Sequence, residues 1–314
     1  MQHKPYLAQM ARSDPPPAPE RLDRAGLFQA LGAYGIWGVL PIFFFALKGV
    51  GAGEVVAGRV LWSLGLLAIV ILALGRTSAI IAALRNRRAM LLLSASAALI
   101  SANWLVYIWA VQNGHVLEGS LGYFLNPLVN VLLGVVLLRE KLGRAQMVAV
   151  GLAGIGVAVL AVGAGQGIWI SLTLAFSFGF YGLVRKVAPV GALEGLTLET
   201  AILAPFGLAY LFWLSTHGGL EFGNEALATT LLVLSGVVTA VPLLLFAGAA
   251  RRLPYSTLGL LQYLAPTMQF VLAITYFGER VTTAHLICFA LIWTGLAIYA
   301  ADGLLAARRR RVIA

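Results

Sequence analysis

Long apolar runs recur along the whole chain and constrain its fold more than any other feature. A bilayer core about 30 Å thick takes about 20 helical residues to cross, and the runs between charges and turn residues are close to that length. Only 11% of the 314 residues are charged, whereas soluble domains carry about 25%. We therefore expect an all-α integral membrane protein with ten transmembrane helices. The predicted spans are 26–46, 55–75, 89–111, 119–138, 146–163, 167–184, 196–215, 228–248, 257–277 and 284–304.

The two ends of the chain lack such runs. Residues 1–24 contain the proline-rich SDPPPAPE and have no hydrophobic core before Leu27. We therefore expect a disordered cytoplasmic tail there rather than a cleavable signal peptide. Residues 305–314 carry RRRR and are expected to form a basic cytoplasmic tail. The single cysteine, Cys288, excludes an intrachain disulfide and a cysteine metal cluster.

Lysine and arginine predict which loops face the cytoplasm, because cytoplasmic loops retain basic residues. With the N-terminus inside, nineteen of the 22 basic residues fall in inner segments. Only Lys48 and Arg280 fall in outer segments, and Arg59 lies within a span. We therefore expect a multi-pass protein with both termini in the cytoplasm.

Two stretches 139 residues apart share a pattern of polar residues. They read LGYFLNPLVNVLLGVVLLREKL and LLQYLAPTMQFVLAITYFGERV. The aligned pairs are Pro127 with Pro266, Asn130 with Gln269, and Glu140 with Glu279. Proline, carboxamide and acid agree at one offset, which indicates an internal repeat.

A second pair of similar stretches lies upstream, and its members are 140 residues apart. GAGEVVAGRVLW and GALEGLTLETAI align Glu54 with Glu194 and Arg59 with Glu199. The order of the pieces is the same in both halves, so we expect two five-helix repeats. Their ranges are 25–163 and 164–304. Five is odd, so the second repeat enters the membrane from the opposite side, and inverted repeats of this kind are typical of secondary transporters.

Two prolines lie near the middle of predicted spans. Pro127 cannot donate to the carbonyl of Tyr123, and Pro266 cannot donate to that of Gln262, so we expect each span to kink. Freed backbone is tolerated at membrane depth only where protein or a water-filled cavity satisfies it. Side chains beside these kinks either line a substrate site or bond helices together, and the sequence leaves both interpretations open. They are Tyr123, Asn126, Asn130, Gln262, Tyr263 and Gln269.

One block of the sequence carries a family resemblance. SANWLVYIWAVQNGHVLEGSLGYFLNPLVNVLLGVVLLREKL (101–142), with RVLWS (59–63) and LTLET (196–200), resembles the RarD proteins. These belong to the EamA group of the drug/metabolite transporter superfamily. The likeness runs from about Gly26 to Gly303. It implies an inverted five-plus-five repeat of ten helices, a permease function and a place in the bacterial inner membrane, and it does not specify a substrate.

Polar and aromatic residues in the third predicted span form a second group of candidates. Asn103, Trp104 and Tyr107 share one helical face through their spacing of three and four residues. Aromatic rings with a polar tip suit a pocket for amphipathic organic molecules. We therefore expect these three residues to line the substrate cavity, with an aromatic belt at the membrane surface as the alternative.

Arg59 and Glu199 are charged residues inside predicted spans, near opposite faces. A charge at mid-bilayer costs a few kcal/mol, although Arg59 is shallow enough to snorkel. We interpret Arg59 as an anchor for an anionic substrate group or as a gate. Glu199 is the candidate for proton coupling, and the alternative is an acid shallow enough to stay solvated or to pair with Arg185 or Lys186. We do not expect Arg59 and Glu199 to pair with each other.

The function expected from these features is secondary transport. The chain has no GxxxxGK[ST] loop and no HExxH motif, so we expect neither a nucleotide-driven pump nor an enzyme. No cofactor or metal is expected. The prediction is an exporter of small organic metabolites or drugs that works by alternating access, with the proton as candidate coupling ion. The alternatives are a passive facilitator or exchanger of the same fold and a membrane receptor that does not transport. The expected partners are a small-molecule substrate, protons and lipid, and not nucleic acid.

Overall fold

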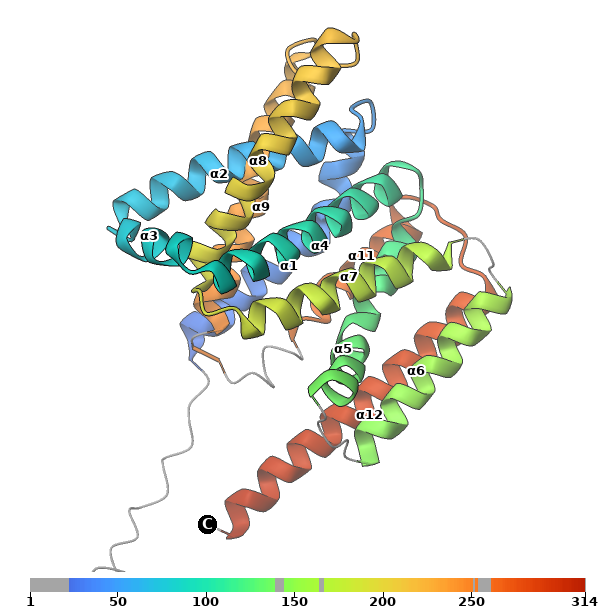
Figure 1. Cartoon of the computed structure of the whole chain (residues 1–314). Helices are drawn as coiled ribbons and strands as arrows, with labels where there is room; N and C mark the ends of the chain where they lie inside the picture. Colours follow the sequence, from blue (N-terminus) through green and yellow to red (C-terminus); the bar gives the residue numbers. More distant parts are fainter. Residues whose placement is uncertain (1–22, 139–143, 164–166, 251, 254–260, 314) are drawn as a thin grey trace, which may run out of the picture.

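The computed structural model describes residues 23–138, 144–163, 167–250, 252–253 and 261–313. All regular elements in these ranges are helices (Figure 1). They are α1 (Arg24–Ala46), α2 (Ala52–Ala73), α3 (Thr77–Arg85), α4 (Arg87–Gln112), α5 (Val116–Leu138), α6 (Arg144–Gly163), α7 (Ile168–Val187), α8 (Ala192–Thr216), α9 (Ala226–Ala250), α11 (Leu264–Thr275) and α12 (Thr283–Ile313).

The composition and surface of these helices are those of a multi-pass membrane protein. Within the described ranges, α1, α2, α4, α7, α8 and α9 contain stretches long and apolar enough to cross a bilayer. Shorter apolar stretches lie in α6, α11 and α12. Large apolar side chains are widely exposed, among them Phe28 at 74% and Phe212 at 72%. Each predicted span overlaps at least one described helix, while the count of ten membrane crossings stays a prediction.

One helix was not predicted. The sequence indicated a loop between the second and third spans, and the structure has α3 there, nine residues long. Its apolar side chains recur at helical spacing, and Ala83 is buried while Ile81 and Leu84 are exposed. An amphipathic helix this short cannot span a bilayer, so a search for spans passes over it.

The helix termini follow local capping chemistry. Asp23 accepts hydrogen bonds from the N–H groups of Ala25 and Gly26 at the start of α1. Asn86 accepts from the N–H of Ala89 at the start of α4, which separates that helix from α3. Such caps satisfy amide groups that have no partner within the helix.

Pro266 lies in the first turn of α11, because this helix begins at Leu264 and residues 262 and 263 form a turn. Proline is tolerated there, since the first N–H groups of a helix have no intrahelical acceptor. In the described part of the predicted span 257–277, Leu261 is helical, residues 262 and 263 form a turn, and α11 follows from Leu264. Pro127 falls inside α5; its side chain and that of Asn130 lie outside the described residues.

The helices pack in a defined set of pairs. α5 packs against α7, α2 against α8 and α9, and α1 against α9 and α11. α6 and α12 pack chiefly against each other and lie at one side of the bundle (Figure 1). The main apolar core joins α1, α2, α4, α5 and α7 with residues from α6, α9, α11 and α12.

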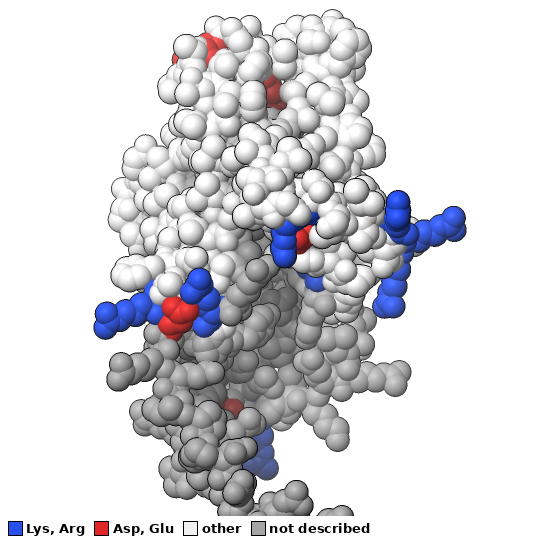
Figure 2. Space-filling view, turned by 90° about the vertical axis from the view of Figure 1, so that its left-hand side faces the viewer, with Lys and Arg blue, Asp and Glu red and all other residues white. Residues whose placement is uncertain are grey.

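Charged side chains join distant segments at one end of the bundle, which we call the α2–α3 end (left in Figure 1). Asp23, before α1, lies 3.2 Å from Arg252, which follows α9. Arg76, between α2 and α3, lies 2.7 Å from Glu194 in the first turn of α8. Figure 2 faces this end and shows basic side chains gathered across its middle.

The described α1–α2, α4–α5, α8–α9 and α11–α12 loops make contacts with one another at the opposite end, which we call the α4–α5 end. Gln112, at the end of α4, donates to two carbonyls of the α1–α2 turn. Glu54, in the first turn of α2, accepts from the N–H of Phe222 in the α8–α9 loop at 2.8 Å. Glu279, after α11, accepts from the N–H of Val116 at 2.7 Å. The long helices therefore run between two distinct ends, as membrane spans do.

Candidate functional site

Arg59 of α2 lies inside the bundle and is only 5% exposed. Its Nε donates to the Thr239 hydroxyl of α9 at 3.1 Å. The guanidinium carbon lies 4.1 Å from the ring centroid of Trp104 on α4 and 5.3 Å from that of Phe44 on α1. Four helices thus surround one cation, and aromatic faces take the place that a carboxylate has in an ion pair.

Asn103 joins α4 to α7 and to α5. Its Nδ2 donates to the carbonyl of Leu174 at 3.0 Å and to the hydroxyl of Ser177 at 2.9 Å. The hydroxyl of Tyr123 donates to Asn103 Oδ1 at 3.3 Å. Both amide hydrogens are therefore engaged in helix contacts, and Asn103 orients the Tyr123 ring.

Tyr107 lies between these two groups. Its ring centroid is 6.1 Å from that of Phe44 and 5.2 Å from that of Tyr123. Its hydroxyl is buried and makes no hydrogen bond within the described part of the chain. Phe44, Arg59, Asn103, Trp104, Tyr107 and Tyr123 therefore form one continuous group, which we call the Arg59 cluster.

Glu199 of α8 is 1% exposed and has partners on two other helices. The Ser96 hydroxyl of α4 donates to Oε1 at 2.5 Å, and the Tyr181 hydroxyl of α7 donates to Oε2 at 3.4 Å. Arg185 Nε lies 3.6 Å from Oε1. The charge of Glu199 is thus balanced by a neighbouring cation, and Arg59 is not among its partners.

α5 and α11 cross at a second polar contact. The Ser120 hydroxyl of α5 donates to the carbonyl of Pro266 at 2.7 Å. Gln269 Nε2 donates to the carbonyl of Trp37 at 2.9 Å, whereas its Oε1 is buried without a partner in the described ranges. Asn126 Oδ1 is likewise buried and unpartnered there. Two acceptor oxygens, one on α5 and one on α11, are therefore buried without a partner among the described residues.

Two further candidate residues lie in the turn before α11. The Tyr263 ring lies 6.2 Å from that of Phe124 in a stacked arrangement. Gln262 precedes it in the turn before α11 and is partly buried. Both residues form the turn that interrupts the helix ahead of Pro266.

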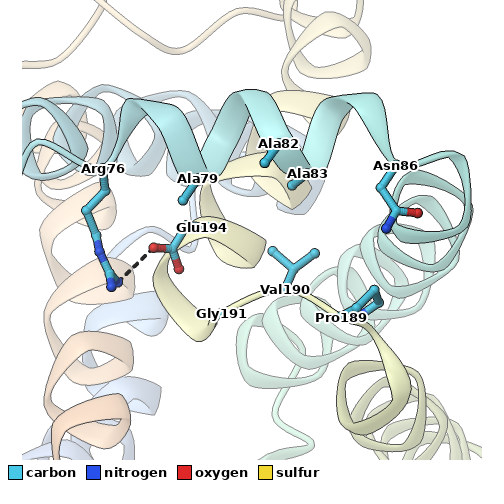
Figure 3. A pocket seen from close by; sticks show the side chains of 9 residues that line it. All are labelled: Arg76, Ala79, Ala82, Ala83, Asn86, Pro189, Val190, Gly191 and Glu194. Atoms are coloured by element: carbon cyan, nitrogen blue, oxygen red, sulfur yellow. Dashed lines mark ion pairs between the residues drawn. The ribbon is translucent and has the colours of Figure 1, made fainter.

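A cavity of about 420 Å³ opens at the α2–α3 end, between α3 and the α7–α8 turn (Figure 3). Alanines of α3 line one side, and Pro189, Val190 and Gly191 line the other. The Arg76–Glu194 ion pair closes one end of it. Arg185 donates to the carbonyl of Gly191, which lines the cavity. The same arginine lies beside Glu199, so Arg185 connects the cavity wall to the Glu199 group.

Comparison with known proteins assigns the chain to a family. Residues 24–162 match the model of the EamA-like transporter family. Protein RarD of Streptomyces exfoliatus is 48% identical over 293 residues, which cover 93% of each chain. Protein RarD of Escherichia coli is 42% identical, covering 91% of this chain and 97% of the relative. The chain belongs to the RarD family of EamA-like transporters.

Other similarities agree with this assignment. A relative from Pseudomonas aeruginosa named chloramphenicol-sensitive protein RarD is 31% identical, covering 87% of this chain and 92% of its own. One solved crystal structure superposes with a TM-score of 0.60 at 20% identity, over 88% of this chain and 98% of the other. At that identity the likeness concerns the fold alone.

In this RarD-family chain, four predicted substrate-binding residues lie together with Arg59: Asn103, Trp104, Tyr107 and Tyr123. Tyr263 lies against Phe124 of α5, Gln269 lies on α11, and Asn126 lies on α5. Sequence reasoning missed Thr239 and Phe44 as partners of Arg59, and Ser96 as a partner of Glu199. A hydroxyl inside an apolar run was a usable signal for Thr239 and Ser96, but their partners depend on which helices pack together.

Proposed function

We propose that this chain is a secondary transporter that exports a small organic molecule across the bacterial inner membrane. It works by alternating access between two inverted five-helix halves, residues 25–163 and 164–304, with both termini in the cytoplasm. Family membership supplies the transporter class, and the two-fold pattern of helix contacts supports the mechanism.

The contact between α6 and α12 is the observation that carries this proposal. A Cβ on Gly156 would lie 3.2 Å from the carbonyl oxygen of Cys288. A Cβ on Gly295 would lie 3.1 Å from the carbonyl oxygen of Ala149. Adding 139 to 149 and 156 gives 288 and 295, which is the offset of the sequence repeat. Each half therefore offers the same glycine to the same position of the other, as a two-fold axis between antiparallel helices requires.

The other helix pairs follow the same rule. If α1, α2, α4, α5 and α6 correspond in order to α7, α8, α9, α11 and α12, the α5–α7 contact has its counterpart in α11–α1. The α4–α7 contact corresponds to α9–α1, and α2–α9 corresponds to α8–α4. A bundle with this symmetry can exchange the roles of its halves, which is the basis of alternating access.

Two glutamates at equivalent positions of the two repeats make contacts at opposite ends of the bundle. Glu54 holds the α8–α9 loop at the α4–α5 end, and Glu194 holds Arg76 at the α2–α3 end. We propose that these contacts open in turn, with the α2–α3 end facing the cytoplasm. The basic side chains around that end in Figure 2 support this orientation, since cytoplasmic loops retain positive charge.

Glu199 is the proposed proton site. Its carboxylate joins α8 to α4 and α7 through Ser96, Tyr181 and Arg185. Protonation removes the charge that holds Arg185, so uptake of a proton weakens the contact between α7 and α8. The cavity beside Arg76 and Glu194 lies at the start of α8, and we propose that water approaches Glu199 from this end.

Proteoliposome counterflow tests the proposal. Vesicles containing the purified protein are preloaded with unlabelled amino acids, small aromatic acids or chloramphenicol, the last because of the name of one relative. Accumulation of one labelled compound is expected. Glu199→Gln should keep this exchange and lose uptake driven by a pH gradient. If Glu199→Gln leaves gradient-driven uptake intact, the protein is a facilitator or exchanger without a proton step at this residue.

Cross-linking tests alternating access directly. Cysteines replace Arg76 and Glu194 in a Cys288→Ala background, and a bifunctional thiol reagent joins them. We expect the joined protein to stop transporting, while each single-cysteine variant treated with the same reagent continues. Undiminished counterflow in the joined protein would refute movement at this end. Binding without any flux would favour the receptor alternative.

A further inference from the structure

We infer that the substrate of this transporter carries an anionic group and that the Arg59 guanidinium binds it, with the rings of the Arg59 cluster holding an apolar or aromatic body. The inference rests on the proposed transport function and names the substrate class of its site.

The hydrogen-bonding capacity of Arg59 is mostly unused. A guanidinium has five N–H donors in one plane. Arg59 uses Nε toward Thr239, and its two terminal nitrogens make no hydrogen bond within the described part of the chain. The guanidinium carbon lies over the Trp104 ring, 4.1 Å from its centroid. The terminal N–H groups of a guanidinium match the two oxygens of a carboxylate.

The charge of Arg59 is also unbalanced. No carboxylate of the described residues lies within ion-pair distance of it, although it is almost fully buried. A buried charge is costly unless it is paired. Glu199, the repeat-related residue, is also buried but has Arg185 as its counter-ion. Arg59 therefore lacks the partner that its counterpart in the other half possesses.

The surroundings of Arg59 favour an organic anion over a simple inorganic one. Phe44 and Trp104 flank the cation, and Tyr107 extends the aromatic wall to Tyr123. The Tyr107 hydroxyl has no partner in the described ranges and is free to donate to a second oxygen. A site with an aromatic wall and one cation suits an aromatic or apolar carboxylate.

Three probes of nearly the same shape test the charge requirement: benzoate, benzamide and benzamidinium. Binding is measured by titration calorimetry on the full chain in nanodiscs. We expect benzoate to bind at least about tenfold more tightly than benzamide, from charge-assisted hydrogen bonds, and benzamidinium not to bind. Equal affinity for benzoate and benzamide would overturn the inference.

Variants locate the binding to Arg59. Arg59→Met should reduce the preference for benzoate over benzamide to less than about twofold, and Arg59→Lys should restore part of it. Arg280→Met is the matched control, since this arginine is exposed near the α4–α5 end. Benzoate should also change tryptophan emission, and Trp104→Phe should abolish that change without abolishing binding. A preference that survives Arg59→Met in a folded protein places the anion elsewhere and refutes the assignment.

The calorimetric and vesicle results separate the two proposals. If binding is charge-selective and depends on Arg59 but no compound shows counterflow, the anion site is supported and the transport function is refuted. Counterflow of neutral compounds by wild type and Arg59→Met alike leaves transport standing and removes the anion site. Thermal unfolding of each variant in the same nanodiscs identifies loss of fold. Thr239→Val removes the Nε acceptor, together with the hydrogen bond from this hydroxyl to the Ser235 carbonyl, and provides a milder second variant expected to weaken benzoate binding.

Discussion

Substitution of Gly236 by alanine should loosen the contact between α2 and α9. A Cβ at this position would lie 2.5 Å from the carbonyl carbon and the Cβ of Trp62, about 1 Å short of ordinary contact between carbon atoms. These atoms belong to or adjoin the backbone of α2, so rotation of a side chain cannot relieve the clash. The Ser63 hydroxyl also donates to the carbonyl of Gly236 at 3.3 Å, and that bond is lost if the helices separate.

The magnitude follows from opposing contributions. Overpacking in a tight interior costs about 1–3 kcal/mol, and loss of the Ser63 hydrogen bond costs about 1 kcal/mol. Replacing a helical glycine with alanine returns about 1 kcal/mol. We therefore expect Gly236→Ala to lower the free energy of unfolding by about 1–3 kcal/mol.

The control is Gly65→Ala on α2, where a Cβ would meet no atom within 4 Å. It has only the helix-propensity gain and should stabilise the protein by up to about 1 kcal/mol. Unfolding in mixed micelles, followed by tryptophan fluorescence, compares the two variants with the wild type. If Gly236→Ala is as stable as Gly65→Ala, α2 and α9 do not approach as closely as described, and the position of Thr239 beside Arg59 is then also wrong.

Three further outcomes follow from single contacts. Burial raises the pKa of Glu279 from an ordinary value of 4.5 to about 7. The N–H groups of Leu117 and Val116 lower this pKa, but their effect is smaller than that of burial. The folded protein therefore binds more protons than the unfolded chain between these values, and its stability should fall by about 1–2 kcal/mol as the pH rises from 4.5 to 7, after allowance for partial exposure. Glu279→Gln should flatten this slope in unfolding measured at several pH values, and stability that rises with pH over that window would contradict the reasoning. Glu54→Gln leaves one acceptor oxygen for two backbone N–H groups, Glu221 and Phe222, and should cost about 1–2 kcal/mol, while the exposed Glu225→Gln should change thermal stability little. Asn103→Leu removes both donors that join α4 to α7 and should destabilise by about 1–3 kcal/mol in thermal unfolding. Ser101→Ala, at a half-buried position whose hydroxyl bonds within α4, should change stability less.

Hydropathy and charge located the helices well, because lipid exposure makes length and composition the main requirements of a span. α3 escaped that reasoning, since its amphipathic pattern serves a short helix and not a crossing. The start of α11 at Leu264 also escaped it, because proline in an apolar run is compatible with a kink or with a first turn. Nothing local in the sequence distinguishes the two.

The candidate site was predictable in its members more than in its contacts. Arg59, Trp104 and Tyr107 stood out as a charge and amphipathic rings inside apolar runs. That Trp104 lies on the face of Arg59 depends on α2 and α4 meeting at particular residues, which one-dimensional spacing cannot specify. Asn103 illustrates the same limit, because only the position of α7 shows that its amide bonds Leu174 and Ser177.

The pairing of α6 with α12 has a consequence for how the protein is made. About 120 residues separate the end of α6 from the start of α12, and synthesis of that length takes roughly 6 to 24 s at 5–20 residues per second. During this interval Gly156 faces lipid instead of Cys288. The glycine surface of α6 is therefore a temporary docking face in the bilayer during biogenesis, open to helices of other nascent chains or to insertion factors until its own partner arrives.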